Sequence, residues 1–249
     1  VIGLMACSVG YSQSKHEISA WGIGGFSSLN YDSSLGERDN RTGMGVGIGY
    51  SYAITKNISI NTGLEYASYK ANYFQHELKD ATYMTNDGTD DFEFRYTVRN
   101  YKERQIHKTL NIPIMVQYQT EGDYAFFGSL GGKIGIPIKS EYSVTRLFMK
   151  TTGYYEQYGG LILDEPEFMG FGLYGYPEGR EGNKDLDMKL AFMLSAEAGL
   201  KCKLYKSMSL YTGLYVDYGI NDVRDNKNKE FQEYNTTNPE NIIHNSVLA

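Results

Sequence analysis

Residues 42–66 read TGMGVGIGYSYAITKNISINTGLEY, and large apolar residues alternate with smaller ones along most of this stretch. Over residues 44–52, every second side chain is large and apolar, and the residues between them are glycine and serine. After a short turn at residues 55–57, an alternation resumes over residues 58–67. Alternation over about nine to eleven residues is the length at which a tilted β-strand crosses a bilayer. The stretch therefore predicts a tight hairpin of two membrane-length strands.

The same pattern returns in two further pairs of segments. One pair is residues 110–119 and 124–136, joined by the turn TEGD, and the other is residues 190–202 and 209–218. In each segment large apolar residues share one face, while mostly small, polar or charged residues share the other. These segments predict two more hairpins.

Another strand is predicted before these hairpins, at residues 18–29 with the sequence ISAWGIGGFSSL. Its parity is ambiguous, because Trp21 and Phe26 do not keep one phase. A β-bulge at Gly24 and Gly25 would reconcile the two halves of this strand.

The connections between the predicted strands alternate in length. Those within the hairpins are short, whereas the long ones cover residues 32–42, 74–108, 140–188 and everything after Ile220. Outer-membrane barrels have short periplasmic turns and long external loops. The sequence thus predicts an all-β fold, an eight-stranded antiparallel up-and-down transmembrane β-barrel. Its last strand is expected to be missing, because the segment that ends at Ala249 reads as a loop turning back toward a final strand.

The composition argues against two other classes of protein. The 249 residues include 28 Gly and 23 Tyr but only 5 Pro and 2 Cys, which favours an all-β chain. No stretch approaches the roughly 18 consecutive apolar residues that a membrane-spanning helix needs. The net charge of −6 comes without a basic stripe, so nucleic acid is not an expected partner.

The first residues, VIGLMACSVGYSQ, read as the tail of a secretory signal, with a short apolar run and small residues before the polar segment SQSKHE. We expect residues 1–13 to be the signal remnant and residues 14–249 to form the barrel, incomplete at its C-terminus. The residues up to Cys7 also outline a lipobox, which would place a lipid on that cysteine. A plain signal cleaved near Ser12 is the favoured interpretation.

Alternation alone does not say which face is buried, because a soluble lipocalin-like barrel also alternates. The face of small and charged residues would be a poor water-exposed surface, but it suits a narrow barrel interior. Aromatic residues near both ends of the strands also resemble the two girdles of membrane barrels. The girdle residues are Tyr50, Tyr52, Tyr118, Tyr124 and Phe126 near the short turns, with Tyr66 and Tyr218 near the long loops. These features favour a membrane barrel.

Several motifs resemble the outer-membrane β-barrel family common in Bacteroidetes, including the barrel half of OmpA-like proteins. They are SAWGIGGFSSL, residues 42–66, LNIPIMVQYQ with its Pro113, and LSAEAGLKCKLYKSMSLYTGLYVDYGIND. The resemblance implies an eight-stranded barrel that serves as an envelope component in the outer membrane of a Gram-negative bacterium, in contact with its lipid and lipopolysaccharide. It also implies, in some members, a periplasmic peptidoglycan-binding domain, which would follow residue 249.

Five charged residues occur on the inward face of the predicted strands, and four of them lie at similar distances from the short turns. They are Glu65, Lys133, Glu197, Lys201 and Asp217. Buried charges are costly unless they are paired, so we expect one mutually neutralising network inside the barrel, with Lys133 at its centre. Paired carboxylates also serve as acid and base in enzymes. An interior plug is favoured because side chains nearly fill an eight-stranded barrel.

The third long connection is rich in aromatic residues that are candidates for binding an extracellular ligand. They are Tyr154, Tyr155, Tyr158, Phe168, Phe171, Tyr174 and Tyr176. Rigid aromatic side chains exposed on a loop make good binding surfaces. The same side chains could instead pack together to hold the loop upright as a hairpin extension, and the sequence leaves both possibilities open.

Neither a metal site nor a cofactor site is predicted. The four His share no short spacing, and the run NDGTDD at residues 86–91 lacks the fuller pattern of a calcium loop, so a hairpin tip is expected there. No nucleophile elbow, phosphate loop or dinucleotide fingerprint is present, so no enzyme activity is predicted. We expect a structural or surface-interaction barrel. The alternatives are a small porin-like channel, a membrane-embedded hydrolase or acyltransferase, and a soluble lipocalin-like ligand-binding barrel.

Overall fold

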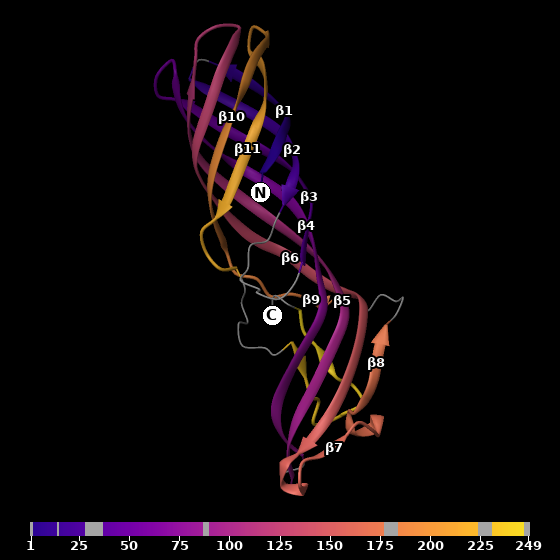
Figure 1. Ribbon diagram of the computed structural model, residues 1–249. Coiled ribbons are helices and arrows are strands. Elements are labelled where there is room, and N and C mark those ends of the chain that lie inside the picture. The colour runs from indigo at the N-terminus through magenta and orange to yellow at the C-terminus, as the bar shows by residue number, and fades with distance from the viewer. Residues whose placement is uncertain are drawn as a thin grey trace.

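The computed structural model describes residues 2–13, 15–27, 37–86, 90–176, 184–223 and 231–246. Eight antiparallel strands close into a ring, which forms the upper half of the molecule in Figure 1. The ring strands are β1 (Ile2–Gln13), β2 (His16–Ser27), β3 (Glu37–Ala53), β4 (Ile58–Asn86), β5 (Asp90–Gln119), β6 (Tyr124–Tyr155), β10 (Ala191–Tyr205) and β11 (Met208–Gly219). Among the described residues, no helix is long and apolar enough to span a membrane.

The three predicted hairpins are confirmed. β3 pairs with β4, β5 with β6, and β10 with β11, and each pair is antiparallel. Short connections join β3 to β4 and β10 to β11, and the turn at residues 120–123 joins β5 to β6. Alternating side chains allow each strand to present one face to the ring interior and the other to its surroundings.

The expectation of a missing strand is wrong for this structure. β1 pairs with β11 from Ile2↔Val216 to Tyr11↔Met208, and with β2 down to Gln13↔His16. Closure satisfies the backbone groups that an edge strand would leave unpaired. Each of the eight described ring strands therefore has two neighbours. The interpretation of residues 1–13 as an export signal stays a prediction.

The bulge predicted at Gly24 and Gly25 is also wrong. β2 and β3 pair in unbroken register from His16↔Tyr52 to Ser27↔Arg41, and the irregularity lies in β1, between Met5 and Cys7. β2 keeps one phase because Trp21 points inward, while Phe26 points outward and is 68% exposed.

Glycines in the neighbouring strands make room for the inward indole ring of Trp21. A Cβ added at Gly47 would clash with the indole, and one added at Gly49 would lie 2.6 Å from it. The small face of β3 that the sequence shows therefore serves to hold the one tryptophan of the chain.

The connections predicted as long loops are in large part continuous strands. β4, β5 and β6 contain 29, 30 and 32 residues and continue well past the ring. β4 and β5 pair as far as Asn86↔Asp90, which brackets the expected hairpin tip, although residues 87–89 lie outside the described residues. β5 changes parity near Asn100, which has a φ of 52° and adjoins a register shift against β6.

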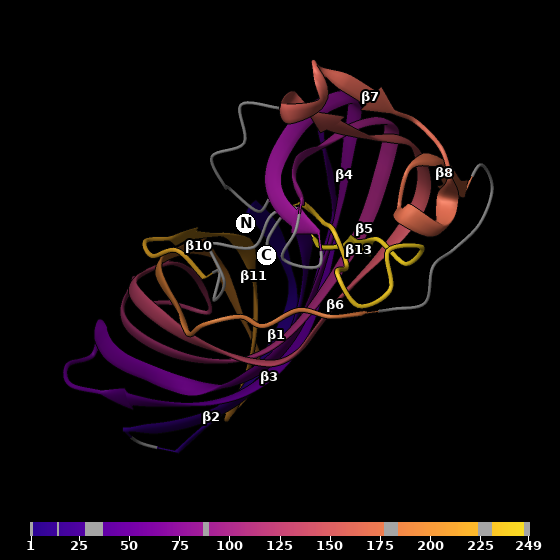
Figure 2. The ribbon, with the colours of Figure 1, turned by 90° about the horizontal axis from the view of Figure 1, so that it is seen from below.

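The continuation of these strands forms a folded unit, which we call the distal extension. It consists of the described parts of residues 69–107 and 139–176, together with residues 231–246, and fills the lower half of Figure 1. Figure 2 shows its sheet curling around the C-terminal segment. Its shorter elements are η1 (Glu156–Tyr158), β7 (Leu161–Leu163), η2 (Glu167–Met169), β8 (Gly172–Tyr176), β12 (Gln232–Glu233) and β13 (Ile243–His244). A two-residue strand, β9 (Lys184–Asp185), pairs with β6 beside it.

The distal extension has its own hydrophobic core. Large aromatic and aliphatic side chains are almost fully buried there, among them Phe92, Phe94, Tyr101, Leu147 and Phe171. The alternating sequence FEFRYTV at residues 92–98 places its apolar residues on this buried face. Because the core is closed by the strands and the C-terminal segment, this part of the chain is a packed module rather than a set of loops.

The ring has the opposite distribution of side chains. The large apolar face of the strands is turned outward, as the alternation predicts. Its exposed residues include Tyr50, Leu64, Ile114, Val116, Leu194 and Leu214. On the inward face, Glu65 is 1% and Lys133 is 4% exposed. The ring thus carries an apolar outer surface around an interior that holds buried charges beside a small cluster of Ile23, Phe127, Tyr211 and Tyr215.

Candidate functional site

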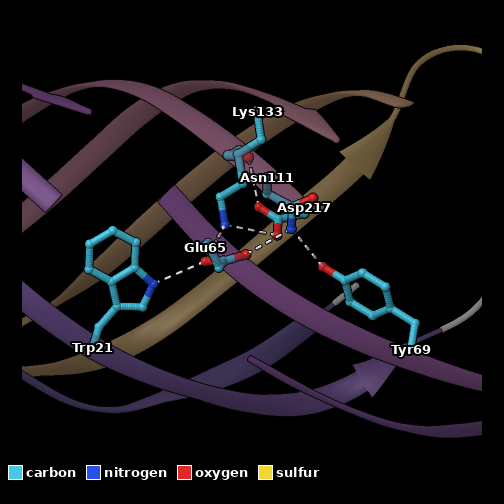
Figure 3. A network of polar contacts seen from close by, with 7 residues as sticks. Trp21, Glu65, Tyr69, Asn111, Lys133 and Asp217 are labelled. Carbon is cyan, nitrogen blue, oxygen red and sulfur yellow. Dashed lines mark hydrogen bonds and ion pairs between the residues drawn. The ribbon is translucent and has the colours of Figure 1, made fainter. Parts of the chain in front are cut away.

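An ion-pair network occupies the middle of the ring (Figure 3). Strand parity turns Glu65 of β4, Lys133 of β6 and Asp217 of β11 inward. The Nζ atom of Lys133 lies 3.0 Å from Oδ2 of Asp217 and 3.7 Å from Oε2 of Glu65. Glu197, on β10, lies within Coulombic range of the same ammonium group. The structure therefore brings together four of the five charges that the sequence suggested.

Neutral side chains donate hydrogen bonds to the two carboxylates closest to Lys133. The indole Nε1 of Trp21 donates to Oε2 of Glu65 at 3.0 Å, and Nδ2 of Asn111 donates to Oε1 at 2.9 Å. The hydroxyl of Ser195 donates to Oδ1 of Asp217 at 2.7 Å. Buried ion pairs are tolerated when hydrogen bonds satisfy their remaining lone pairs. The sequence did not identify these donors, because neutral residues at inward positions carry no charge signal.

Lys201 does not join this network. Its Nζ atom lies 3.1 Å from Oε1 of Gln119 and 3.9 Å from Oε2 of Glu17, and Tyr211 donates to the same glutamate at 2.8 Å. These residues form a second polar cluster nearer the short turns. Sequence reasoning missed Glu17 because the predicted strand began at residue 18, one residue after it.

The central network lies between two cavities inside the ring. Trp21 and Glu197 line a cavity of about 80 Å³ on the side of the short turns. Asn111 and Asp217 line a cavity of about 250 Å³ on the side of the distal extension. Lys133 and its partners lie between these two spaces.

Some of the aromatic residues suggested as a binding surface are buried, and others are exposed. Tyr155 and Phe171 are buried in the core of the distal extension, which agrees with the packing alternative. Tyr154 lies under the guanidinium of Arg95, at 3.8 Å from its ring centroid, and so is also held in place. These side chains stabilise the module rather than offer a surface.

The remaining members of the set are more accessible. Phe168 is 64% exposed, and Tyr158 is exposed but donates a hydrogen bond to Oδ1 of Asp90 at 2.9 Å. This bond and the nearby negative charge raise the pKa of the Tyr158 hydroxyl. Tyr174 donates to the backbone oxygen of Glu167 at 3.1 Å. The side chain of Tyr176 lies outside the described residues.

Charged pairs cover the surface of the distal extension. Glu77 accepts a hydrogen bond from Nε of Arg99 at 3.2 Å and lies 3.5 Å from Nζ of Lys79. The bond from Arg99, with the charge of Lys79, lowers the pKa of the Glu77 carboxyl. Among the described residues, no group of three His, Cys, Asp or Glu side chains is placed to hold a metal ion.

A closed ring of antiparallel strands with an apolar outer surface and charged groups buried inside is typical of outer-membrane β-barrel proteins. The chain belongs to the family described as outer membrane protein beta-barrel domain, whose model matches residues 11–225. This match extends from the end of β1 past the end of β11 and indicates an outer-membrane location. Neither a curated protein nor a solved structure gives a significant match to the chain.

Proposed function

We propose that this protein is an eight-stranded outer-membrane barrel whose wall faces lipid and whose distal extension is a surface-interaction module outside the cell, without a catalytic role. One observation carries the proposal. Outward side chains of the ring, such as Leu130 at 70% exposure, are mostly apolar, whereas charged side chains such as Glu65 and Lys133 are buried inside it. A water-soluble barrel would need the reverse arrangement.

The distal extension supports the orientation of the barrel. Its apolar residues gather in an internal core, while ion pairs such as Glu77–Arg99 lie on its surface. A module with this distribution belongs in water rather than in hydrocarbon. Because long strands and loops of outer-membrane barrels face the exterior, we place the distal extension outside the cell and the short turns in the periplasm.

A groove of about 570 Å³ on the distal extension supports the interaction role. Lys79, Arg99 and Lys150 flank it, as ion-pair partners of Glu77 and Asp164, and the exposed apolar side chain of Leu173 lies among them. Cationic and apolar groups side by side suit an anionic amphiphile, such as the lipopolysaccharide of the outer leaflet. Outer-membrane lipid and lipopolysaccharide are the partners that this proposal names.

Site-specific labels test the placement. In a background with Cys7 and Cys202 replaced by serine, a nitroxide at Val116→Cys should collide with oxygen but not with a water-soluble nickel complex. On intact cells, an impermeant maleimide should label Phe168→Cys and spare Lys56→Cys in the periplasmic turn. Nickel access at residue 116 would refute the lipid-facing wall. Labelling of residue 56 without labelling of residue 168 would show that the barrel has the opposite orientation.

A small channel is the second candidate, favoured by the row of cavities along the lumen. In addition to the two beside the network, a cavity of about 410 Å³ opens at the short-turn end, lined by Lys15, His16 and Lys201. The plug around Lys133 interrupts this row. We therefore expect no conductance steps in planar bilayers, and regular steps from the purified protein would favour the channel.

A further inference from the structure

The cavity of about 250 Å³ between the central network and the distal extension has an unusual lining. β5 and β6 contribute His107, Thr109, Asn111 and Ser140 to it. His107, Asn111 and Ser140 are buried, with exposed fractions of 4%, 0% and 7%. Polar side chains thus gather at one side of the cavity.

These side chains hold buried polar atoms that have no hydrogen-bond partner among the described residues. The atoms are Nδ1 and Nε2 of His107, Oγ1 of Thr109, Oδ1 of Asn111 and Oγ of Ser140. Native proteins leave few buried polar groups unpaired, because each one loses its hydration without compensation. A cluster of four around a single cavity indicates groups kept available for a ligand.

The available atoms define the chemistry of that ligand. Asn111 uses its amide nitrogen for Glu65 and for the hydroxyl oxygen of Tyr69 at 3.2 Å, which leaves its Oδ1 as an acceptor. A neutral imidazole offers one donor and one acceptor, and each hydroxyl offers both. Asp217, the carboxylate in the lining, is already held by Lys133 and Ser195. Lys70 and Lys189 also line the cavity, and both have interactions of their own. The unpaired atoms therefore suit hydroxyl groups rather than a charged group.

The rest of the lining is largely apolar. Met188, Ala191 and Met193 line the cavity, with Pro137 and the ring of Tyr69. Drug-sized ligands occupy pockets of about 300–1,000 Å³, so this cavity fits a smaller molecule. The cavity, with a polar side and an apolar side, matches a ligand that has polar groups on one side and hydrocarbon on the other.

We propose that this cavity binds a small uncharged molecule with hydroxyl groups along one side and hydrocarbon along the other, of the size of a cyclic diol or a monosaccharide. The site goes beyond the proposed function, since it lies inside the ring mouth and uses neither the lipid-facing wall nor the groove of the distal extension. Barrel folding and ligand binding can therefore be tested separately.

Methionine methyl groups report on the site directly. Met188 and Met193 line the cavity, whereas Met115 lines the smaller cavity beyond the network and serves as an internal control. With ¹³C-methyl methionine and the protein in lipid nanodiscs, trans-1,2-cyclohexanediol should shift the signals of Met188 and Met193 saturably. The signal of Met115 should stay in place. Shifts that are absent or unsaturable at Met188 and Met193, or equal at Met115, would overturn the proposal.

A matched pair of variants separates the site from the fold. Ala191→Phe fills the cavity and should abolish the shifts, whereas Ala53→Phe, at the opposite mouth, should leave them unchanged. His107→Phe removes the ring nitrogens and should weaken diol binding by roughly tenfold or more while the ring still closes, as judged by heat-modifiable migration. Undiminished binding in Ala191→Phe, or in a folded His107→Phe, would refute the assigned recognition.

Discussion

Lys133 meets its two carboxylate partners at different distances, 3.0 Å for Asp217 and 3.7 Å for Glu65. All three side chains are almost fully buried. In such surroundings an ion pair gains less than its Coulomb energy suggests, because both charges lose their hydration. Removal of one partner is nevertheless costly, because it leaves the other charge buried and uncompensated.

Lys133→Met should therefore destabilise the barrel by about 3 to 5 kcal/mol. Adding Glu65→Gln to Lys133→Met should recover part of this lost stability. Adding Asp217→Asn instead should recover more, because Asp217 lies closer to Lys133 than Glu65 does. Urea unfolding in lipid vesicles measures each variant. Strictly additive losses would show that these residues do not interact.

Lys203→Met is the matched control for this series. Lys203 pairs with Asp123 at 3.8 Å, but both side chains are well exposed. An exposed ion pair contributes about 0–1 kcal/mol, so this variant should unfold close to the wild type. A loss comparable to that of Lys133→Met would mean that burial does not set the cost.

At the scale of elements, β2 and β3 fit together through one large residue and several small ones. Trp21 projects from β2 over Gly47 and Gly49 of β3, and it reaches Glu65 of β4 with its indole nitrogen. The glycines are required here by close approach rather than by an unusual backbone conformation. The large residues of β3 thus form the apolar outer surface, while its glycines make room for Trp21 inside.

Gly47→Val should displace the indole ring and destabilise the barrel by about 1–3 kcal/mol, as overpacking does. Trp21 is the one tryptophan of the chain, so its fluorescence reports the displacement directly. Gly24→Val is the control, because a Cβ at that position meets nothing within 4 Å. Unchanged emission and unfolding in Gly47→Val would contradict this packing.

At the scale of the whole molecule, the sequence predicts the ring better than the distal extension. Strict alternation at residues 44–52 reflects a single physical rule, lipid outside and small or polar groups inside. Residues 92–98 also alternate, but the phase changes near Asn100, so a single period does not continue through β5 into the ring. Packing against residues 231–246, which are distant in sequence, then decides which face is buried.

The same limit applies to the ring closure and to the site. Residues 2–13 form a short segment rich in apolar and small residues, so their sequence resembles an export signal. Their backbone pairing with β11 is what identifies them as a strand. Charged members of the central network were predicted because charge is visible in the sequence. The cavity at His107 was not, because it depends on which polar atoms remain unpaired after folding.

The division of the molecule into a ring and a distal extension leads to a final prediction. Tyr234 joins the C-terminal segment to the core of the extension: its ring lies 5.3 Å from that of Phe92 and 5.2 Å from that of Phe94, and its hydroxyl donates to the backbone oxygen of Met169 at 3.0 Å. The ring strands are held separately, by their own backbone pairing and interior network. Loss of the Tyr234 anchor should therefore loosen the extension and leave the ring closed.

Phe92→Ala and Tyr234→Ala should each cost about 3–5 kcal/mol locally, as truncation of a buried aromatic residue does. Limited proteolysis in vesicles should then cut the extension of either variant faster than that of the wild type. Heat-modifiable migration of the ring should persist, because the extension is not needed to close it. Tyr83→Ala, at a side chain that is 78% exposed in the same extension, should match the wild type in both assays. Loss of heat-modifiable migration in Tyr234→Ala would show that ring and extension fold as one cooperative unit.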